Sequence, residues 1–308
     1  MSINPETLFT NLIIPQNDDC QRLFHGRGHR FAGFEHICID WFKPVVLITL
    51  YKETATELVN QISEFIQANI TACQSIQVQS RHLMQAPIEV VWGQEIDALE
   101  VTEAGLKYGL TLGRSQNHGI FLDIKYGRDW VRQNSQGKRV LNLFSYTCAF
   151  SIAAHAGGAK QILNLDMSRA ALNRGRENHH LNQQDTSIVK FESVDLFKSF
   201  GRVRKHGPYD LLICDPPAFQ KGSVKIERDY KKIIRRIPEF MADGALIMLC
   251  LNSPDLDEAF LTDTVTEYCP ECQFVEQVSA PEVFTDAIAG KGLKVFIYKY
   301  SAVVLSEQ

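Results

Sequence analysis

The sequence lacks a long apolar run and a recognisable targeting segment. No apolar stretch in the 308 residues reaches the roughly 18 residues that a membrane-spanning helix requires. The first residues, Met1 to Glu6, contain neither the basic region nor the apolar region of a secretory signal. We therefore expect a cytoplasmic protein that has no membrane partner.

Positive charge is also scarce, because 32 lysines and arginines face 36 aspartates and glutamates and leave a net charge of −4. Such a chain has no overall positive field that would attract nucleic acid. The segment from residue 221 to residue 236 is an exception, since Glu227 and Asp229 are its only acids among many basic residues. A nucleic-acid partner could therefore contact this segment.

Cysteine is present, but not in a pattern that indicates a disulfide framework or a metal site. The eight cysteines are scattered, and Cys38, Cys214 and Cys250 lie inside apolar runs, where cysteine behaves as a small buried hydrophobic residue. Cys269 and Cys272 have metal-like spacing, but no second cysteine or histidine pair lies at the distance of a zinc site. We predict no metal and interpret this pair as a surface turn between a helix and a strand.

Residues 140–166 predict a strand, a helix and a second strand. Val140–Phe144 is a short apolar run, and residues 149–156 predict a helix that two glycines close. A second apolar run ends on Asp166. A unit of this kind builds a parallel sheet with a ligand crevice beyond the carboxyl ends of its strands. A carboxylate at that place can accept both hydroxyl groups of a ribose.

The turn after the first of these strands contains no glycine. Enzymes that transfer hydride hold a pyrophosphate on a glycine-rich turn, where bare backbone approaches the anion. Residues 144–148 instead read Phe-Ser-Tyr-Thr-Cys. This turn disfavours a nicotinamide oxidoreductase and favours a nucleoside cofactor without phosphate, such as S-adenosylmethionine. On this segment alone, an ordinary unit with a coincidental aspartate is an equally good interpretation.

A second motif, Asp215–Phe219, follows the apolar run Tyr209–Cys214, which predicts another buried strand. Two prolines stiffen this loop and leave its carbonyl groups free as acceptors. Asp215 can face a methyl donor, and Phe219 can stack on a flat base. A Pro-Pro pair after a strand is by itself most often a plain turn. Its place after a nucleoside-type unit favours a binding role.

Together, residues 140–159, 165–168 and 215–219 resemble class I S-adenosylmethionine-dependent methyltransferases of the large-subunit (23S) ribosomal RNA family. That family includes cytosine carbon-5 and guanine nitrogen-7 enzymes. The similarity extends upstream through residues 101–108 and 119–123. It implies an α/β fold, namely a Rossmann-like domain with a mostly parallel seven-stranded sheet whose last pair is antiparallel.

The resemblance also implies a cofactor site. Asp166 would hold the ribose, Asp195 would accept the adenine amino group, and the backbone of residues 144–147 would hold the methionine end. The predicted cofactor-binding residues are Phe121, Asp123, Asn142, Phe144, Ser145, Tyr146, Thr147, Asp166, Met167, Ser168, Asp195 and Asp215.

The predicted catalytic residues are Asp215, Pro216 and Phe219. The resemblance places Asp215 and the Pro216 carbonyl at the reaction centre and Phe219 against the base. In the family an arginine usually stands two residues after the position of Asp123, where this chain has Lys125. A lysine cannot reproduce the planar fork of an arginine, so we assign no role to Lys125.

The chain before this region predicts a small α+β N-terminal domain over residues 1–97. Residues 31–41 and 45–51 predict strands, residues 54–70 predict a helix, and two more strands follow at 75–79 and 88–92. This domain has no constellation of catalytic residue types, and positioning of RNA is one interpretation of it. Residues 98–308 then form the methyltransferase domain, which begins with a β-hairpin.

Residues 225–241 predict one amphipathic helix, with isoleucines and aromatic residues on one side and basic residues on the other. A basic face is most often simply solvated. Its place directly after the Asp-Pro-Pro loop favours contact with RNA phosphates. The predicted RNA-binding residues are Lys221, Lys225, Arg228, Lys231, Lys232, Arg235 and Arg236.

The leading hypothesis is therefore an S-adenosylmethionine-dependent methyltransferase that acts on a base of ribosomal RNA. Alternatives are a methyltransferase acting on a DNA base or a protein side chain, and a non-catalytic RNA-binding protein that retains the fold. A homodimer is left open. We expect attack by a base nitrogen, because Cys250 stands one residue earlier than the cysteine of the cytosine-modifying relatives.

Overall fold

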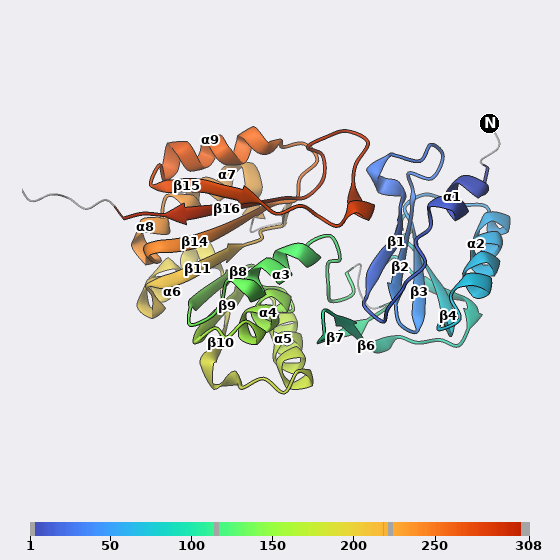
Figure 1. The fold of residues 1–308 in the computed structure, drawn as a ribbon, viewed down its shortest axis with the longest axis horizontal. Coiled ribbons are helices and arrows are strands. Elements are labelled where there is room, and N and C mark those ends of the chain that lie inside the picture. Colours follow the sequence, from blue (N-terminus) through green and yellow to red (C-terminus); the bar gives the residue numbers. More distant parts are fainter. Residues whose placement is uncertain (1–3, 114–116, 218, 221–223, 303–308) are drawn as a thin grey trace, which may run out of the picture. The chain divides into compact units, whose positions relative to one another are not determined.

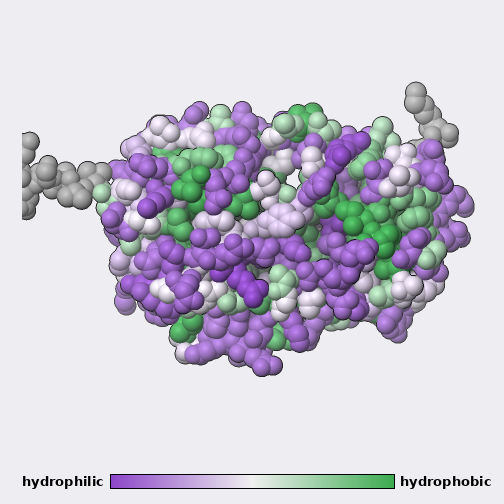
Figure 2. Space-filling view, in the orientation of Figure 1, coloured by the Kyte–Doolittle hydropathy of each residue, from purple (hydrophilic) through white to green (hydrophobic). Residues whose placement is uncertain are grey.

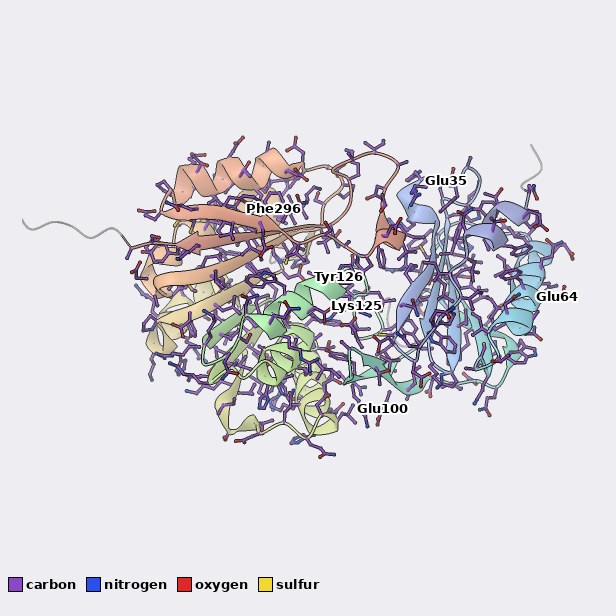
Figure 3. All side chains as sticks on the ribbon, viewed as in Figure 1. Glu35, Glu64, Glu100, Lys125, Tyr126 and Phe296 are labelled. Carbon is purple, nitrogen blue, oxygen red and sulfur yellow. The ribbon has the colours of Figure 1, made fainter. Side chains whose placement is uncertain are left out.

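The computed structural model of the chain describes residues 4–113, 117–217, 219–220 and 224–302. The chain forms two compact units (Figure 1). Unit 1 comprises Met1–Lys125 and Pro281–Ala289, and unit 2 comprises Tyr126–Ala280 and Gly290–Gln308. The chain first passes from unit 1 to unit 2 between Lys125 and Tyr126, which Figure 3 labels.

Unit 1 is built on a sheet of strands rich in apolar and β-branched residues. Its main elements are α1 (Glu6–Asn11), β1 (Gln21–His25), η1 (Gly26–Gly28), β2 (Ile37–Phe42), β3 (Val45–Leu50), α2 (Thr56–Asn69), β4 (Ser75–Ser80), β5 (Ile88–Gly93) and η4 (Glu282–Phe284). Within the described residues, five strands pair in the order β1-β2-β3-β4-β5, and only β3 and β4 run parallel. Helix α2 buries Ile62 and Ile66 in the same core as Ile39 and Ile48 of the sheet.

A hairpin of β6 (Ala98–Glu103) and β7 (Leu106–Thr111) also belongs to unit 1. Asp19 forms a bridge with Thr102, and its carboxylate accepts from the Ala104 N–H at 3.1 Å. The Lys125 ammonium donates to the same carboxylate at 3.1 Å. The structure therefore divides the chain after residue 125 and not at the predicted residue 97, because these contacts tie the hairpin to the N-terminal segment.

Unit 2 is built on a second sheet. Its strands are β8 (Arg139–Leu143), β9 (Gln161–Asp166), β10 (Val189–Ser193), β11 (Tyr209–Cys214), β14 (Met241–Leu251), β15 (Cys272–Gln277) and β16 (Lys294–Tyr300). In the part of the chain that the structure describes, these seven strands pair in the order β10-β9-β8-β11-β14-β16-β15. Strand β16 is antiparallel to both neighbours, and the other pairs are parallel. This arrangement confirms the predicted Rossmann-like, parallel-rich α/β fold.

Helices cover both faces of this sheet. They are α3 (Lys125–Gln133), α4 (Ala149–Ala156), α5 (Arg169–Leu181), α6 (Phe200–His206), α7 (Ile226–Ile234), α8 (Ile237–Phe240) and α9 (Glu258–Tyr268), with short turns η2 (Thr186–Ile188) and η3 (Leu196–Lys198) and a small hairpin of β12 (Phe219–Gln220) and β13 (Val224–Lys225). Leu141 and Leu143 share a core with Ile233 of α7 and Leu261 of α9. On the opposite face, the Asn164 amide donates to the Ser151 hydroxyl of α4 at 2.9 Å.

The structure corrects three predictions of secondary structure. Residues 31–36 form turns, and the strand begins only at Ile37. Strand β1 was not predicted. The helix expected over residues 225–241 is divided into α7 and α8, because Pro238 cannot donate the backbone bond that a continuous helix needs. Met241, the last residue of that expected helix, already belongs to β14.

Most of the surface that Figure 2 shows is hydrophilic, with smaller hydrophobic patches between the polar residues. Single apolar side chains do protrude, and Met84 is 89% exposed. Each helix in the described part of the chain is too short or too polar to cross a membrane.

Candidate active site

The turn after β8 has an unusual backbone conformation. Phe144, Tyr146 and Cys148 have φ values of 57°, 45° and 62°, in the left-handed region that residues with a side chain rarely adopt. Each such residue costs on the order of 1–3 kcal/mol of stability, and this conformation persists only where the surroundings hold it in place. Here they do, because the Ser145 N–H donates to the Leu165 carbonyl at 2.9 Å and the Cys148 N–H donates to the Ser145 carbonyl at 2.7 Å. The turn is therefore fixed against the end of β9.

Asp166, the last residue of β9, is the centre of this arrangement. One carboxylate oxygen accepts from the Tyr146 N–H at 2.9 Å, and the other accepts from the Ser168 N–H at 2.7 Å. Ser168 in turn caps α5, since its hydroxyl accepts from the Ala171 N–H at 3.1 Å. The carboxylate is thus oriented by two backbone donors. Each oxygen keeps a lone pair for a ligand.

Helix α5 packs closely beneath the turn. A side chain at Gly175 would place its Cβ 2.5 Å from the Cys148 sulfur, so only glycine fits there. The Asn178 amide also donates to the Thr147 carbonyl at 3.2 Å. Because of these contacts, residues 144–148 rest on a rigid helix.

A pocket opens where β9 and β10 end. Asp195 follows β10 and caps η3, because its carboxylate accepts from the Phe197 N–H at 2.9 Å. The rings of Phe144 and Phe197 lie 6.5 Å apart. The pocket therefore combines two carboxylates with apolar and aromatic walls. Its lining residues are Phe144, Leu165, Asp166, Met167, Val194, Asp195, Leu196 and Phe197.

The loop after β11 begins with Asp215, which is half-buried, and Pro216, which is buried. Tyr230 of α7 contacts the carboxyl ends of β11 and β14. Its hydroxyl lies 2.8 Å from the Cys250 carbonyl of β14 and 3.4 Å from the Cys214 carbonyl of β11. The ends of two adjacent strands are therefore fixed by one side chain.

Two lysines hold the loop that follows β14. The buried Lys294 ammonium donates to the Ser253 carbonyl at 3.1 Å, and the Lys291 ammonium donates to the Pro254 carbonyl at 2.7 Å. Lys294 is the first residue of β16, and Lys291 lies in the segment that leads into it. The loop thus has a fixed path at the same edge of the sheet as Asp215.

The predicted RNA-binding residues do not form one open basic face. The buried Asp229 carboxylate accepts from Arg228 at 2.8 Å and from Lys232 at 2.6 Å. These hydrogen bonds, that from Arg228 first, hold the pKa of Asp229 far below its usual value. Among the other predicted residues that the structure describes, Lys225 pairs with Glu227 and Arg236 pairs with Glu239. The Lys231 ammonium lies 5.8 Å from the centre of the Tyr268 ring, and Arg235 is exposed.

The thiols of Cys148, in the turn after β8, and Cys214, the last residue of β11, are not suited to nucleophilic attack. Burial raises the pKa of Cys148 to about 12 and raises the pKa of Cys214 further, so both remain protonated at neutral pH. Among the described residues, no group of three or more histidine, cysteine, aspartate or glutamate side chains could hold a metal ion.

The structure brings only some of the predicted site residues together. Phe144, Asp166, Met167 and Asp195 share the pocket. Asn142 is buried, and its amide donates to Asn164 at 2.8 Å. Of the other predicted site residues, Phe121 and Asp123 belong to unit 1, Ser145 and Thr147 are buried in the turn, and Lys221 and the side chain of Phe219 lie outside the described residues.

Sequence reasoning missed the pocket residues Val194, Leu196 and Phe197 and the bridging hydroxyl of Tyr230. The first three could have been found, because they flank the predicted Asp195 on both sides. Tyr230 gave no such signal, since it occupies an ordinary apolar position of an amphipathic helix.

Comparison with known proteins adds four findings. A family model described as S-adenosylmethionine-dependent methyltransferase matches residues 21–299. A ribosomal RNA large subunit methyltransferase I from Erwinia tasmaniensis is 30% identical over 280 residues, which cover 86% of this chain and 70% of that protein. Its counterpart from Cronobacter sakazakii is 28% identical over 273 residues, which cover 84% and 68% of the two chains. The crystal structure of SMU.776 complexed with SAH superposes with a TM-score of 0.82 at 25% identity, covering 92% of this chain and 76% of that one.

Proposed function

Because this chain belongs to the S-adenosylmethionine-dependent methyltransferase family, we propose that it transfers a methyl group to a base of ribosomal RNA. The substrate is proposed from the names of the relatives from Erwinia tasmaniensis and Cronobacter sakazakii. The observation that carries the proposal is the pocket at the ends of β9 and β10, where Asp166 and Asp195 both line the wall.

The residues that line the pocket have the chemistry to bind a nucleoside. Asp166 has both carboxylate oxygens oriented by backbone donors and can accept the two ribose hydroxyls. Asp195 can accept an exocyclic amino group, while the apolar walls at Phe144 and Phe197 suit an aromatic base. The strained backbone of residues 144–147 would hold the amino-acid end. S-adenosylmethionine, when bound, supplies a methyl group on a positively charged sulfur.

We assign the acceptor side to the carboxyl ends of the adjacent strands β11 and β14. Asp215 and the Pro216 carbonyl would accept a proton or an amino hydrogen of the base, and Phe219 would stack on its ring. Asn252 begins the loop after β14, whose next two carbonyls are held by lysines. This loop would orient the base, and a base inside a helix would first be flipped out.

The proposal is tested by incubating the purified chain with S-adenosylmethionine carrying a labelled methyl group and ribosomal RNA from a strain that lacks the gene. We expect label in the large-subunit RNA and, after digestion, in one modified nucleoside. Asp166→Ala is the control that should transfer none. Label in DNA or protein, or no label with any of these acceptors, would refute the proposed substrate.

We further propose that the attacking atom is a nitrogen of the base. Carbon-5 of a pyrimidine needs a cysteine thiolate to add at the neighbouring carbon, whereas a nitrogen has its own lone pair. The buried Cys250 lies between Leu249 and Leu251, which point into the core beneath α7 and α9. Because strand side chains alternate, the thiol faces the other side of the sheet.

Substitution of this cysteine tests the target atom. Cys250→Ser should keep most of the methyl transfer, measured as labelled methyl incorporated per minute. Cys214→Ser is a matched control at a buried thiol of the adjacent strand. A Cys250→Ser variant that binds cofactor and RNA but transfers nothing would favour cytosine carbon-5 instead, as would a covalent adduct with RNA that contains fluoropyrimidine.

A further inference from the structure

The Cys269–Cys272 pair has a structure that the sequence did not predict. We interpreted it as a surface turn, but Cys269 is 0% exposed and Cys272 is 8% exposed. Cys269 follows the last residue of α9, and Cys272 opens β15. The two residues form a turn, yet both side chains point into the core of unit 2 and belong to its hydrophobic cluster.

The two sulfur atoms lie 3.5 Å apart. The Cys272 N–H donates to the Cys269 carbonyl at 3.0 Å, which is the hydrogen bond of a four-residue turn. Such a turn brings its first and last Cα atoms within about 7 Å of each other. A disulfide needs a Cα separation of about 4.4–6.8 Å and a sulfur separation of about 2.0 Å. The backbone therefore already fits a disulfide, and only the side chains have to rotate.

We propose that Cys269 and Cys272 are a redox-reactive dithiol, which a low-molecular-weight disulfide such as glutathione disulfide converts to an intramolecular disulfide. The Cys272 thiol, the more exposed of the two, loses its proton and attacks one sulfur of the small disulfide, which releases one thiol. The Cys269 sulfur then loses its proton and displaces the second small thiol from Cys272. Two protein thiols are oxidised, and one small disulfide is reduced to two thiols.

The second step is favoured by proximity and slowed by protonation. The hydrogen bond with Cys272, together with burial, raises the pKa of Cys269. Its thiolate is therefore scarce at neutral pH, and the reaction should accelerate as the pH rises. The product would join the end of α9 to the start of β15. This site does not depend on the proposed RNA substrate.

The test counts thiols in the intact chain. The native protein is incubated with excess glutathione disulfide, quenched in acid, unfolded and alkylated, and its mass is measured. We expect the alkylated thiols to fall from eight to six, and the loss to be faster at pH 8.5 than at pH 7. Cys73→Ser, at another buried cysteine, should still lose two thiols. Cys269→Ser should lose one, as an unresolved mixed disulfide of Cys272 with glutathione, and Cys272→Ser should lose none.

A peptide map identifies the pair without any variant. A protease that cuts after glutamate separates Tyr268–Glu271 from Cys272–Glu276. These two peptides should be recovered after oxidation as one species, with their summed mass less two hydrogen atoms, and as two peptides after reduction. Eight alkylated thiols in the oxidised wild type, mixed disulfides with glutathione alone, or a disulfide between other cysteines would overturn the proposal.

Discussion

The cofactor side and the acceptor side of the candidate site differ in what their charged residues contact. On the cofactor side, the Asp166 carboxylate accepts from two backbone N–H groups, and Asp195 accepts from a third. On the acceptor side, Arg228 and Lys232 of α7 are paired with the buried Asp229, and Arg236 is paired with Glu239. Backbone donors orient both carboxylates of the first set, and Asp195 also pairs with the exposed Lys198 ammonium at 3.4 Å. The second set is held by other side chains.

This difference indicates how each side would work. Neutral donors orient the Asp166 carboxylate without cancelling its charge, so this carboxylate can bind hydroxyl groups at once. Cations that already have a carboxylate partner contribute first to the fold and have less charge left for a phosphate. The comparison therefore predicts strong effects of single carboxylates and weak effects of most single basic residues.

The largest effect is expected on the cofactor side. Asp166→Ala should weaken S-adenosylmethionine binding by about 2–4 kcal/mol, because charge-assisted hydrogen bonds to the ribose are lost. Calorimetric titration measures this. Asp185→Ala is a matched control, since the Asp185 carboxylate likewise accepts from the backbone N–H two residues later, at Ser187. Equal cofactor affinity in a folded Asp166→Ala variant would refute the assignment of the ribose site.

The buried carboxylate of α7 should matter for the fold instead. Asp229→Ala should lower the free energy of unfolding by about 2–3 kcal/mol, the scale of hydrogen bonds to a charged group. Denaturant titration measures it. Glu227→Ala, on the same helix but exposed, is the control and should change stability little. If the two variants were equally stable, the contacts of Asp229 would contribute nothing.

The same residue predicts a pH dependence. The pKa of Asp229 is lowered in the folded chain, so its contribution to stability is complete above the unfolded pKa of about 4 and is lost as the pH falls below it. The stability difference between wild type and Asp229→Ala should therefore shrink on acidification from pH 5 to pH 3. A constant difference over that range would contradict the lowered pKa.

A smaller effect, on RNA binding, should distinguish the basic residues that have an ion-pair partner among the described residues from those that have none there. Reversing Lys231 and Arg235 to glutamate should weaken RNA binding about tenfold and flatten its salt dependence by roughly one to two in log–log slope, since each phosphate contact releases counterions. Reversing Arg236, which already pairs with Glu239, should have less effect on RNA. Fluorescence anisotropy over a salt series measures both. Unchanged affinity and slope in the double variant would mean that this surface is merely solvated.

The smallest expected effect concerns the strand ends. Tyr230→Phe removes the hydroxyl at the Cys250 and Cys214 carbonyls and should cost about 1 kcal/mol of stability. Methyl transfer should fall while cofactor affinity stays the same, because the loops on the acceptor side lose their common support. Tyr209→Phe is a control, as its hydroxyl also meets a buried carbonyl, at Val203 in α6. Equal loss of transfer in both variants would indicate general destabilisation.

What could be predicted from the sequence depended on whether the signal was local. The strand Tyr209–Cys214 and the acid that ends β9 were predicted correctly, because an apolar run and its closing residue are adjacent in the chain. The sequence could also have shown that the predicted helix is divided into α7 and α8, since Pro238 is visible within it. Strand β1 could not be predicted in this way. Its five residues are a strand because β2 pairs with them.

The ion pairs of α7 show the same limit for the site. An amphipathic pattern separates the apolar side of a helix from the polar side. It does not show that Asp229 is buried at 1% exposure and draws Arg228 and Lys232 toward it. The turn after β8 was predicted as glycine-free, but its three left-handed residues became visible only in the structure.

The discontinuous composition of unit 1 has a consequence for biosynthesis. Residues 281–289 belong to this unit, where the Phe284 ring lies 5.1 Å from that of His25 and the Ala287 N–H donates to the Gly28 carbonyl. A ribosome releases the N-terminal residues long before it makes these. The nascent chain must therefore hold unit 1 without its last segment while every described strand of the unit 2 sheet except β16 emerges. Unit 1 is therefore the first unit to begin folding, but it is completed only after residues 281–289 have been made.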